Sequence, residues 1–222
     1  MASGCYVELE VEVSTAVVLV AILGSLLVGV ISPGPSFVMV AHTSIALSRR
    51  HGVASALGMG LGGVAFASLA LVGLQALLMQ VTWLYLILKI IGGAYLIYNA
   101  VRLWRGAPRP FAIAPAARLA PSSVARAFWL GLATQISNPK TAVVYASVFA
   151  ALLPPAPPLW LLGLLPPLIF SLEAGWYVIV AVIFSSDRPR SAYLRSKSWI
   201  DRVVSGVMAG LGIRLLMDAA AR

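Results

Sequence analysis

Cysteine, histidine and charged side chains are scarce in this chain of 222 residues. Cys5 is the only cysteine, which excludes an intrachain disulfide and a redox pair of cysteines. The two histidines, His42 and His51, are isolated and make a poor metal site, so we expect no bound metal and no cofactor. Charged residues make up 10% of the sequence, whereas a soluble domain contains roughly 25%. A soluble domain is therefore not expected.

Short motifs of membrane-embedded catalysis are also missing. The sequence contains no His-Glu-x-x-His, no Gly-x-Ser-x-Gly and no paired catalytic aspartates. We therefore expect no catalytic residues. An intramembrane enzyme acting on a lipid or a small amphiphile is kept as the alternative function.

Long apolar stretches fill most of the chain, which is 60% hydrophobic. About 20 apolar residues suffice for a helix to cross a bilayer. We expect an all-α integral membrane protein with six transmembrane helices, at 15–31, 53–79, 81–103, 127–153, 159–184 and 199–217. Residues 36–48 are apolar but short, and are expected to form an amphipathic or re-entrant piece.

A polar, proline-containing stretch divides the expected spans into two groups. Residues 106–123 are predicted to be a linker between halves at 14–105 and 124–222, which together form one transporter domain behind an acidic leader at 1–13. Each half holds three expected spans. Because three is an odd number, the second half must be inserted upside down, which predicts a 3+3 inverted repeat.

The net charge of +9 is concentrated in three loops, at 49–52, 105–126 and 187–198. The turns at 80–82 and 154–158 contain no lysine or arginine. Because basic residues mark the cytoplasmic side of a membrane, we expect these three loops in the cytoplasm and both termini in the periplasm. This distribution favours the lipid bilayer over a nucleic acid as the partner.

Two blocks of ten residues interrupt the apolar pattern at corresponding places in the two halves. Residues 31–40 read Ile-Ser-Pro-Gly-Pro-Ser-Phe-Val-Met-Val, and residues 136–145 read Ile-Ser-Asn-Pro-Lys-Thr-Ala-Val-Val-Tyr. The alignment pairs Ser32 with Ser137 and Ser36 with Thr141. Mirrored interruptions of this kind point to a transporter binding site. We expect broken helices at 32–36 and 137–141, meeting near the midplane across a shared polar cavity.

The first block has a helix-breaking centre. Proline removes a backbone donor and clashes with the preceding turn, and glycine permits unusual backbone angles. The freed backbone groups must be satisfied by protein, water or ligand, and the start of the following helix is suited to a carboxylate. The alternative is a simple end of the first span. The candidate substrate-binding residues are Ser32, Pro33, Gly34, Pro35 and Ser36.

The second block adds a cation at membrane depth. Asn138 can cap the restarted helix, and Pro139 fits its first position. Lys140 would then lie in the first turn, where it either binds a substrate carboxylate, extends to an interface or pairs with an acid. Asn138, Pro139, Lys140 and Thr141 complete the candidate substrate-binding set.

Glu173 lies well inside the fifth expected span. We expect it to be the only carboxylate within a span, and either paired or protonated part of the time. Proton coupling, contact with a substrate ammonium group, and a structural ion pair with Lys140 or Lys89 are all compatible with this position. It is the candidate proton-coupling residue.

Pairs of glycines recur at helical spacing, namely Gly58 with Gly62 and Gly206 with Gly210. Such pairs let helices approach closely in lipid. We expect intramolecular packing, with a homodimer face as the alternative.

Four sequence features, spread over nearly the whole chain after about residue 14, form a combination typical of a known family. They are Pro-Gly-Pro at 33–35, the glycine-rich second span, Lys89 with Gly92, Tyr95 and Leu96, and Asn-Pro-Lys at 138–140. In this combination the chain resembles the LysE/RhtB family of bacterial amino-acid exporters. The resemblance implies export of an amino acid or a derivative, driven by the proton gradient across the bacterial cytoplasmic membrane.

Two positions refine this resemblance. Glu173 falls about where many members of the family place an acidic residue in the fifth span. Many members also carry an aspartate just after the glycines of the second span, and here that place is Gly63. The resemblance therefore argues against a cationic substrate such as lysine.

Overall fold

The computed structural model describes residues 2–80, 82–108, 123–154 and 157–220, and in these ranges all regular structure is α-helical. The helices are α1 (Ala2–Ile31), α2 (Pro35–Ala46), α3 (Arg49–Gln80), α4 (Thr82–Gly106), α5 (Val124–Ile136), α6 (Pro139–Leu152), α7 (Leu159–Phe184) and α8 (Asp187–Ala220). The expected all-α class is thus confirmed. The leader at 1–13 lies largely in α1, and its separation from the transporter domain stays a prediction.

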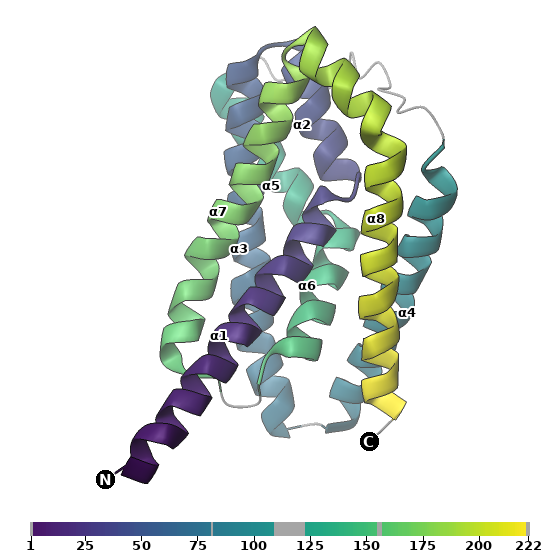
Figure 1. Ribbon diagram of the computed structural model, residues 1–222. Coiled ribbons are helices and arrows are strands. Elements are labelled where there is room, and N and C mark those ends of the chain that lie inside the picture. Colours follow the sequence, from purple (N-terminus) through teal and green to yellow (C-terminus); the bar gives the residue numbers. More distant parts are fainter. Residues whose placement is uncertain (1, 81, 109–122, 155–156, 221–222) are drawn as a thin grey trace.

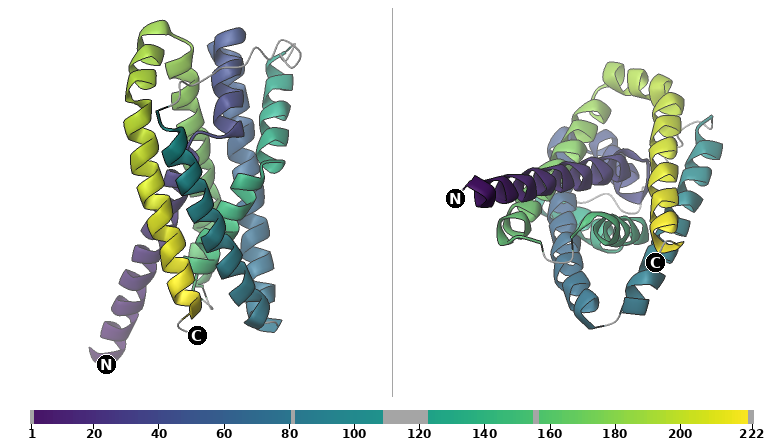
Figure 2. Two further views of the ribbon diagram at one scale, coloured as in Figure 1. Left: turned by 90° about the vertical axis from the view of Figure 1, so that its right-hand side faces the viewer. Right: turned by 60° about the horizontal axis from the view of Figure 1, so that its bottom comes forward.

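The helices form an elongated bundle in which the chain runs repeatedly from one end to the other (Figures 1 and 2). Both termini lie at the same end, and the connections from α2 to α3 and from α7 to α8 lie at the opposite end (Figure 1). Three helical stretches are long and apolar enough to cross a membrane, at Arg49–Gly73, Leu159–Phe184 and Ser191–Ala220. The pair α1 and α2 makes a fourth if it counts as one bent span.

Helix boundaries agree with the sequence in the fifth span and disagree in the sixth. The helix α7 has the bounds that were expected. The expected loop at 187–198 is wrong, because α8 begins at Asp187. Its first turns carry charged residues, which hide a helix from a search for apolar runs. Tyr193 and Lys197 are nevertheless buried there, so these turns pack against the bundle. Most of the expected linker, at 109–122, lies outside the described residues.

Both breaks are present but shorter than expected. Only residues 32–34 separate α1 from α2, which meet at an angle of 57°, and residues 137–138 separate α5 from α6. Ser36 and Thr141 therefore belong to the first turns of the restarted helices. Gly34 adopts φ −153° and ψ −171°, an extended conformation open to any residue. Unusual backbone angles are thus not the reason for this glycine, and its conformation is the one that a following proline favours.

Glycines bring two pairs of helices into close contact. A Cβ atom added at Gly58 would lie 2.1 Å from the carbonyl oxygen of Phe128, so α3 and α5 touch through their backbones. Gly93 and Gly212 join α4 and α8 in the same way. Intramolecular packing is therefore confirmed for Gly58. It is wrong for Gly206 and Gly210, where such an atom would meet no described atom within 4 Å.

Apolar residues gather in two clusters. One contains Phe149 and draws on α1, α3, α4, α6, α7 and α8, and the other contains Phe37 and draws on α1, α2, α3, α7 and α8. Residues from both clusters line one small polar cavity at the breaks. The polar site is therefore enclosed between the two halves of the apolar core.

Candidate functional site

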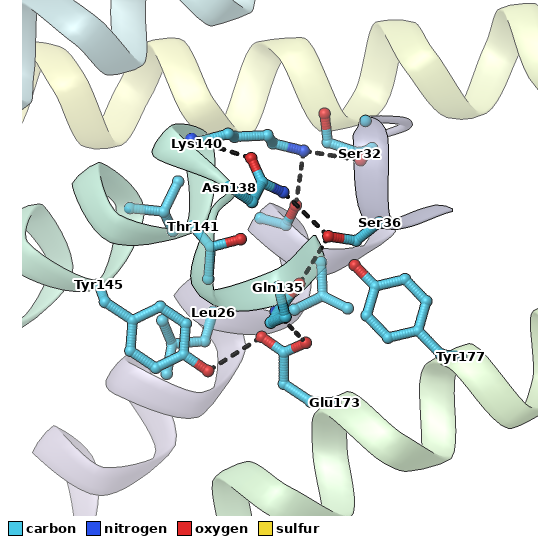
Figure 3. Close-up of a pocket in the computed structure, with 14 residues that line it drawn as sticks. Leu26, Ser32, Ser36, Gln135, Asn138, Lys140, Thr141, Tyr145, Glu173 and Tyr177 are labelled. Atoms are coloured by element: carbon cyan, nitrogen blue, oxygen red, sulfur yellow. Dashed lines mark hydrogen bonds between the residues drawn. The ribbon is translucent and has the colours of Figure 1, made fainter. Parts of the chain in front are cut away.

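The two breaks lie in direct contact (Figure 3). The Asn138 amide nitrogen Nδ2 donates a hydrogen bond to Ser36 Oγ at 2.9 Å. Lys140 Nζ donates to the carbonyl oxygen of Ser32 at 2.7 Å. Residues about a hundred positions apart in the sequence thus meet, and their predicted proximity is confirmed.

The two helix restarts differ in how they are capped. Asn138 caps α6, because its side chain accepts a hydrogen bond from the backbone N–H of Lys140 at 3.0 Å, and Pro139 takes the first helical position. This part of the sequence prediction is confirmed. The restart of α2 also has a proline near its beginning, but its N-cap is Gly34 and no side chain caps it.

Lys140 satisfies the backbone of the first break. Pro33 has no N–H, so the carbonyl of Gly29 loses the donor that a continuous helix would supply four residues later. Lys140 Nζ donates to Gly29 O at 3.0 Å as well as to Ser32 O, and so closes the end of α1. A cation at a helix C-terminus is also stabilised by the helix dipole.

The ion pair between Lys140 and Glu173, one of the alternatives that the sequence left open, is not formed, because Lys140 Nζ contacts the two carbonyl oxygens instead. Glu173 is 1% exposed and accepts hydrogen bonds from neutral groups. Tyr145 Oη donates to Oε1 and Gln135 Nε2 donates to Oε2, both at 2.9 Å. The side chain of Lys89, the other candidate partner, lies outside the described residues.

A continuous chain of hydrogen bonds joins Glu173 to both breaks (Figure 3). Gln135, which donates to Glu173, accepts from Ser36 Oγ at 2.6 Å, and Ser36 accepts from Asn138. Tyr177 points its hydroxyl toward Ser36 from α7 (Figure 3). The Glu173 carboxyl group and both breaks are thus joined by direct contacts.

Sequence reasoning missed three members of this site. None of Gln135, Tyr145 and Tyr177 was among the candidate site residues. A signal existed for Tyr145, because it follows Thr141 by four residues and so shares its face of α6. The same signal existed for Tyr177, because it follows Glu173 by four residues and so shares its face of α7.

Gly63, the position at which the chain departs from the family pattern, lies at this site. A Cβ atom there would be 2.9 Å from Glu173 Cγ and 3.0 Å from Tyr145 Oη. Any side chain at residue 63 would therefore displace the carboxyl group or its donor. The glycine leaves Glu173 as the carboxylate of this small cavity.

Two cavities adjoin the breaks. The inner one, beside Glu173, has a volume of about 20 Å³, which is room for roughly one water molecule. The outer one measures about 380 Å³, within the range of about 300–1,000 Å³ typical of ligand pockets. Both are lined by Ser32, Gly34, Asn138 and Lys140. Ser36 and Thr141 line the inner cavity, and Pro33, Pro35 and Pro139 line the outer one.

Polar side chains from α4 and α8 complete the wall of the outer cavity. They are Tyr95, Asn99, Arg102, Lys197 and Asp201. Asp201 is fully buried inside the sixth expected span. The expectation that Glu173 is the only carboxylate within a span is therefore wrong. A search for apolar runs passes over Asp201 because it lies at the edge of the expected span.

Comparison with known proteins finds one family and several relatives that are similar to most of the chain. Residues 27–219 match the family described as LysE type translocator. The chain is 31% identical to the threonine efflux protein of Escherichia coli (strain K12) over 193 residues, which cover 86% of this chain and 94% of that protein. It is 33% identical to the threonine efflux protein of Salmonella typhimurium over 199 residues, with the same two coverages.

A third relative is similar over most of its length. This is the uncharacterized membrane protein YahN of Escherichia coli, 30% identical over 197 residues, which cover 88% of this chain and 87% of the relative. No solved structure matches the chain. The region that matches the family, residues 27–219, includes both breaks, Gly63 and Glu173.

Proposed function

The chain belongs to the LysE type translocator family, and from this premise we propose that it exports a small amino acid of the threonine class across the bacterial inner membrane in exchange for protons. The observation that carries the proposal is the hydrogen-bonded chain from Glu173 to both breaks. The named relatives support the substrate class, because two of them are called threonine efflux proteins.

Helix contacts support six spans arranged as a 3+3 inverted repeat. If α1, α2, α3 and α4 correspond to α5, α6, α7 and α8, several contacts come in matching pairs. The contact of α3 with α5 matches that of α7 with α1, and the contact of α2 with α7 matches that of α6 with α3. A pseudo-twofold arrangement of this kind is common in secondary transporters.

One pair of corresponding contacts differs where the outer cavity is found. The backbones of α4 and α6 approach closely, whereas α2 and α8 meet through the stacked rings of Phe37 and Tyr193, whose centroids lie 5.5 Å apart. The outer cavity is lined by both α2 and α8. It also reaches Arg102 and Gly106 in the last turns of α4, toward the end opposite the termini. With both termini in the periplasm, this is a cytoplasm-facing state that an exporter would need for loading.

The surroundings of Glu173 favour a coupling role. Its two hydrogen-bond donors are neutral, and no lysine contacts it within the described residues. Contact with a lysine ammonium would favour the ionised carboxylate. A carboxyl group held by tyrosine and glutamine keeps its partners whether or not it carries a proton. Glu173 can therefore gain and lose a proton without leaving an unpaired buried cation.

Inside-out membrane vesicles provide the test. Their interior corresponds to the periplasm, so an acidic interior should drive uptake of labelled L-threonine in vesicles that contain the protein. We expect Glu173→Gln to abolish this gradient-driven uptake while exchange of labelled for unlabelled threonine persists. The matched control is Asp218→Asn, which removes a carboxyl group that lines neither cavity.

The outcomes separate the parts of the proposal. Full gradient-driven uptake by a stable Glu173→Gln protein would falsify proton coupling through this residue. Wild-type vesicles that neither take up nor exchange any amino acid would contradict amino-acid export. The alternative of an intramembrane enzyme has no support from the two relatives that are named threonine efflux proteins.

A further inference from the structure

The wall of the outer cavity contains a buried carboxylate with one oxygen unused. Asp201 is fully buried and Lys197 is 8% exposed, one turn away on α8. Lys197 Nζ lies 2.5 Å from Asp201 Oδ2. The other oxygen, Oδ1, has no hydrogen-bond partner among the described residues.

An unsatisfied carboxylate oxygen in a buried position is unusual. Buried polar atoms nearly always have a partner, and an exception calls for a bound ion, water or ligand. Lys197 contacts only Oδ2. The free oxygen is therefore suited to a further donor with a positive charge.

The same cavity offers a place for a negative group. The start of α2 lines it through Gly34 and Pro35. No side chain caps this helix start, so the positive end of its dipole remains open to an anion. Arg102 on α4 adds a positive charge to the same wall.

We propose that Asp201 Oδ1 receives the α-ammonium group of a zwitterionic amino acid whose carboxylate lies at the start of α2. This inference rests on the proposed export function and adds to it the residue that selects for a free amino group. Asp201 has no surface open to the cavity. Binding therefore requires a small side-chain movement at this wall, with Lys197 remaining the partner of Oδ2.

Inhibition of labelled L-threonine exchange in proteoliposomes tests the proposal. Three probes are compared: L-threonine, its methyl ester, which keeps the ammonium group, and N-acetyl-L-threonine, which lacks it. A hydrogen bond between charged groups contributes enough that its loss should cost about tenfold or more in affinity. We expect Asp201→Asn to weaken inhibition by L-threonine and by its methyl ester by at least that factor. Inhibition by N-acetyl-L-threonine should remain unchanged.

A matched control and a second variant keep the test decisive. Asp218 lies on the same helix but does not line the cavity, so Asp218→Asn should leave inhibition by all three probes as in the wild type. If Asp201→Asn fails to insert, Asp201→Asn combined with Lys197→Gln removes both buried charges and is expected to show the same change in selectivity.

The results distinguish this inference from the proposed function. Threonine exchange by wild-type protein with unchanged threonine affinity in Asp201→Asn would overturn the role of Asp201 and leave amino-acid export standing; Oδ1 would then bind water. An equal loss for all three probes would also overturn it. Absence of any exchange in the wild type would overturn both.

Discussion

The two breaks arise from aligned blocks of sequence, yet they contribute different chemistry. The second break caps its own helix through Asn138 and sends the Lys140 side chain across to the first. The first break provides carbonyl oxygens at Gly29 and Ser32 and leaves the start of α2 uncapped. One copy thus supplies the cation and the cap, and the other supplies acceptors and an open helix start.

This difference teaches how a repeated segment can acquire a single binding direction. Two equally open helix starts would offer two equivalent places to a substrate carboxylate. Among the described residues, a side chain caps the start of α6 but none caps the start of α2. The comparison therefore predicts that substitutions at aligned positions of the two breaks have unequal effects on stability and on threonine exchange.

Removal of the lysine bridge is expected to have the largest effect. Lys140→Met leaves the carbonyls of Gly29 and Ser32 without their donor. Hydrogen bonds to charged groups contribute roughly 1.5–3 kcal/mol each, so a loss of about 3 kcal/mol in stability is expected, together with loss of transport. Thermal unfolding in detergent and threonine exchange measure the two effects.

The control for this variant is Arg214→Met, which removes a positive charge from an exposed position on α8. It should leave unfolding and exchange close to wild type. An equally small effect of Lys140→Met would mean that the two breaks are held together without the lysine.

Much of this fold follows from the sequence because its signals are local. Pro33 and Pro35 end one helix, and Asn138 with Pro139 begins another, wherever the surrounding chain lies. The bounds of α7 follow from a long apolar run that contains a single charged residue, Glu173. The early start of α8 does not, because its first turns are charged and become helical by packing rather than by hydropathy.

The site was predictable only in part. The contact of the two breaks follows from the aligned blocks. The partner of Lys140 does not follow from the sequence. A lysine is expected to pair with an acidic side chain, but the acceptors here are backbone carbonyls at a helix end broken by a proline. The roles of Gln135 and Tyr145 depend on how α5 and α6 are rotated about their axes, which the sequence constrains only weakly.

The aligned hydroxyls of Ser36 and Thr141 provide the second comparison. Ser36 donates to Gln135 and accepts from Asn138, whereas the Thr141 hydroxyl forms no hydrogen bond within the part of the chain that the structure describes. Ser36→Ala leaves two buried groups unpaired and should lower stability by about 1–3 kcal/mol. Thr141→Val should cost less than about 1 kcal/mol. Thermal unfolding of both variants under one set of conditions makes the comparison, and equal effects would contradict it.

The smallest effect on stability, but a clear effect on binding, is expected from a cap introduced at the first break. Serine and glycine at an N-cap differ by only a few tenths of a kcal/mol. A Cβ atom at Gly34 would lie 3.4 Å from Lys140 Cδ, an ordinary contact. The new hydroxyl of Gly34→Ser would nevertheless cap the helix start at which the proposed substrate carboxylate lies. The half-maximal threonine concentration for exchange should therefore rise several-fold, whereas Gly24→Ser, at an open position on α1, should leave it unchanged. An unchanged value in a folded Gly34→Ser protein would show that the open start of α2 is not the carboxylate site, and the two breaks would then differ in structure but not in their role toward the substrate.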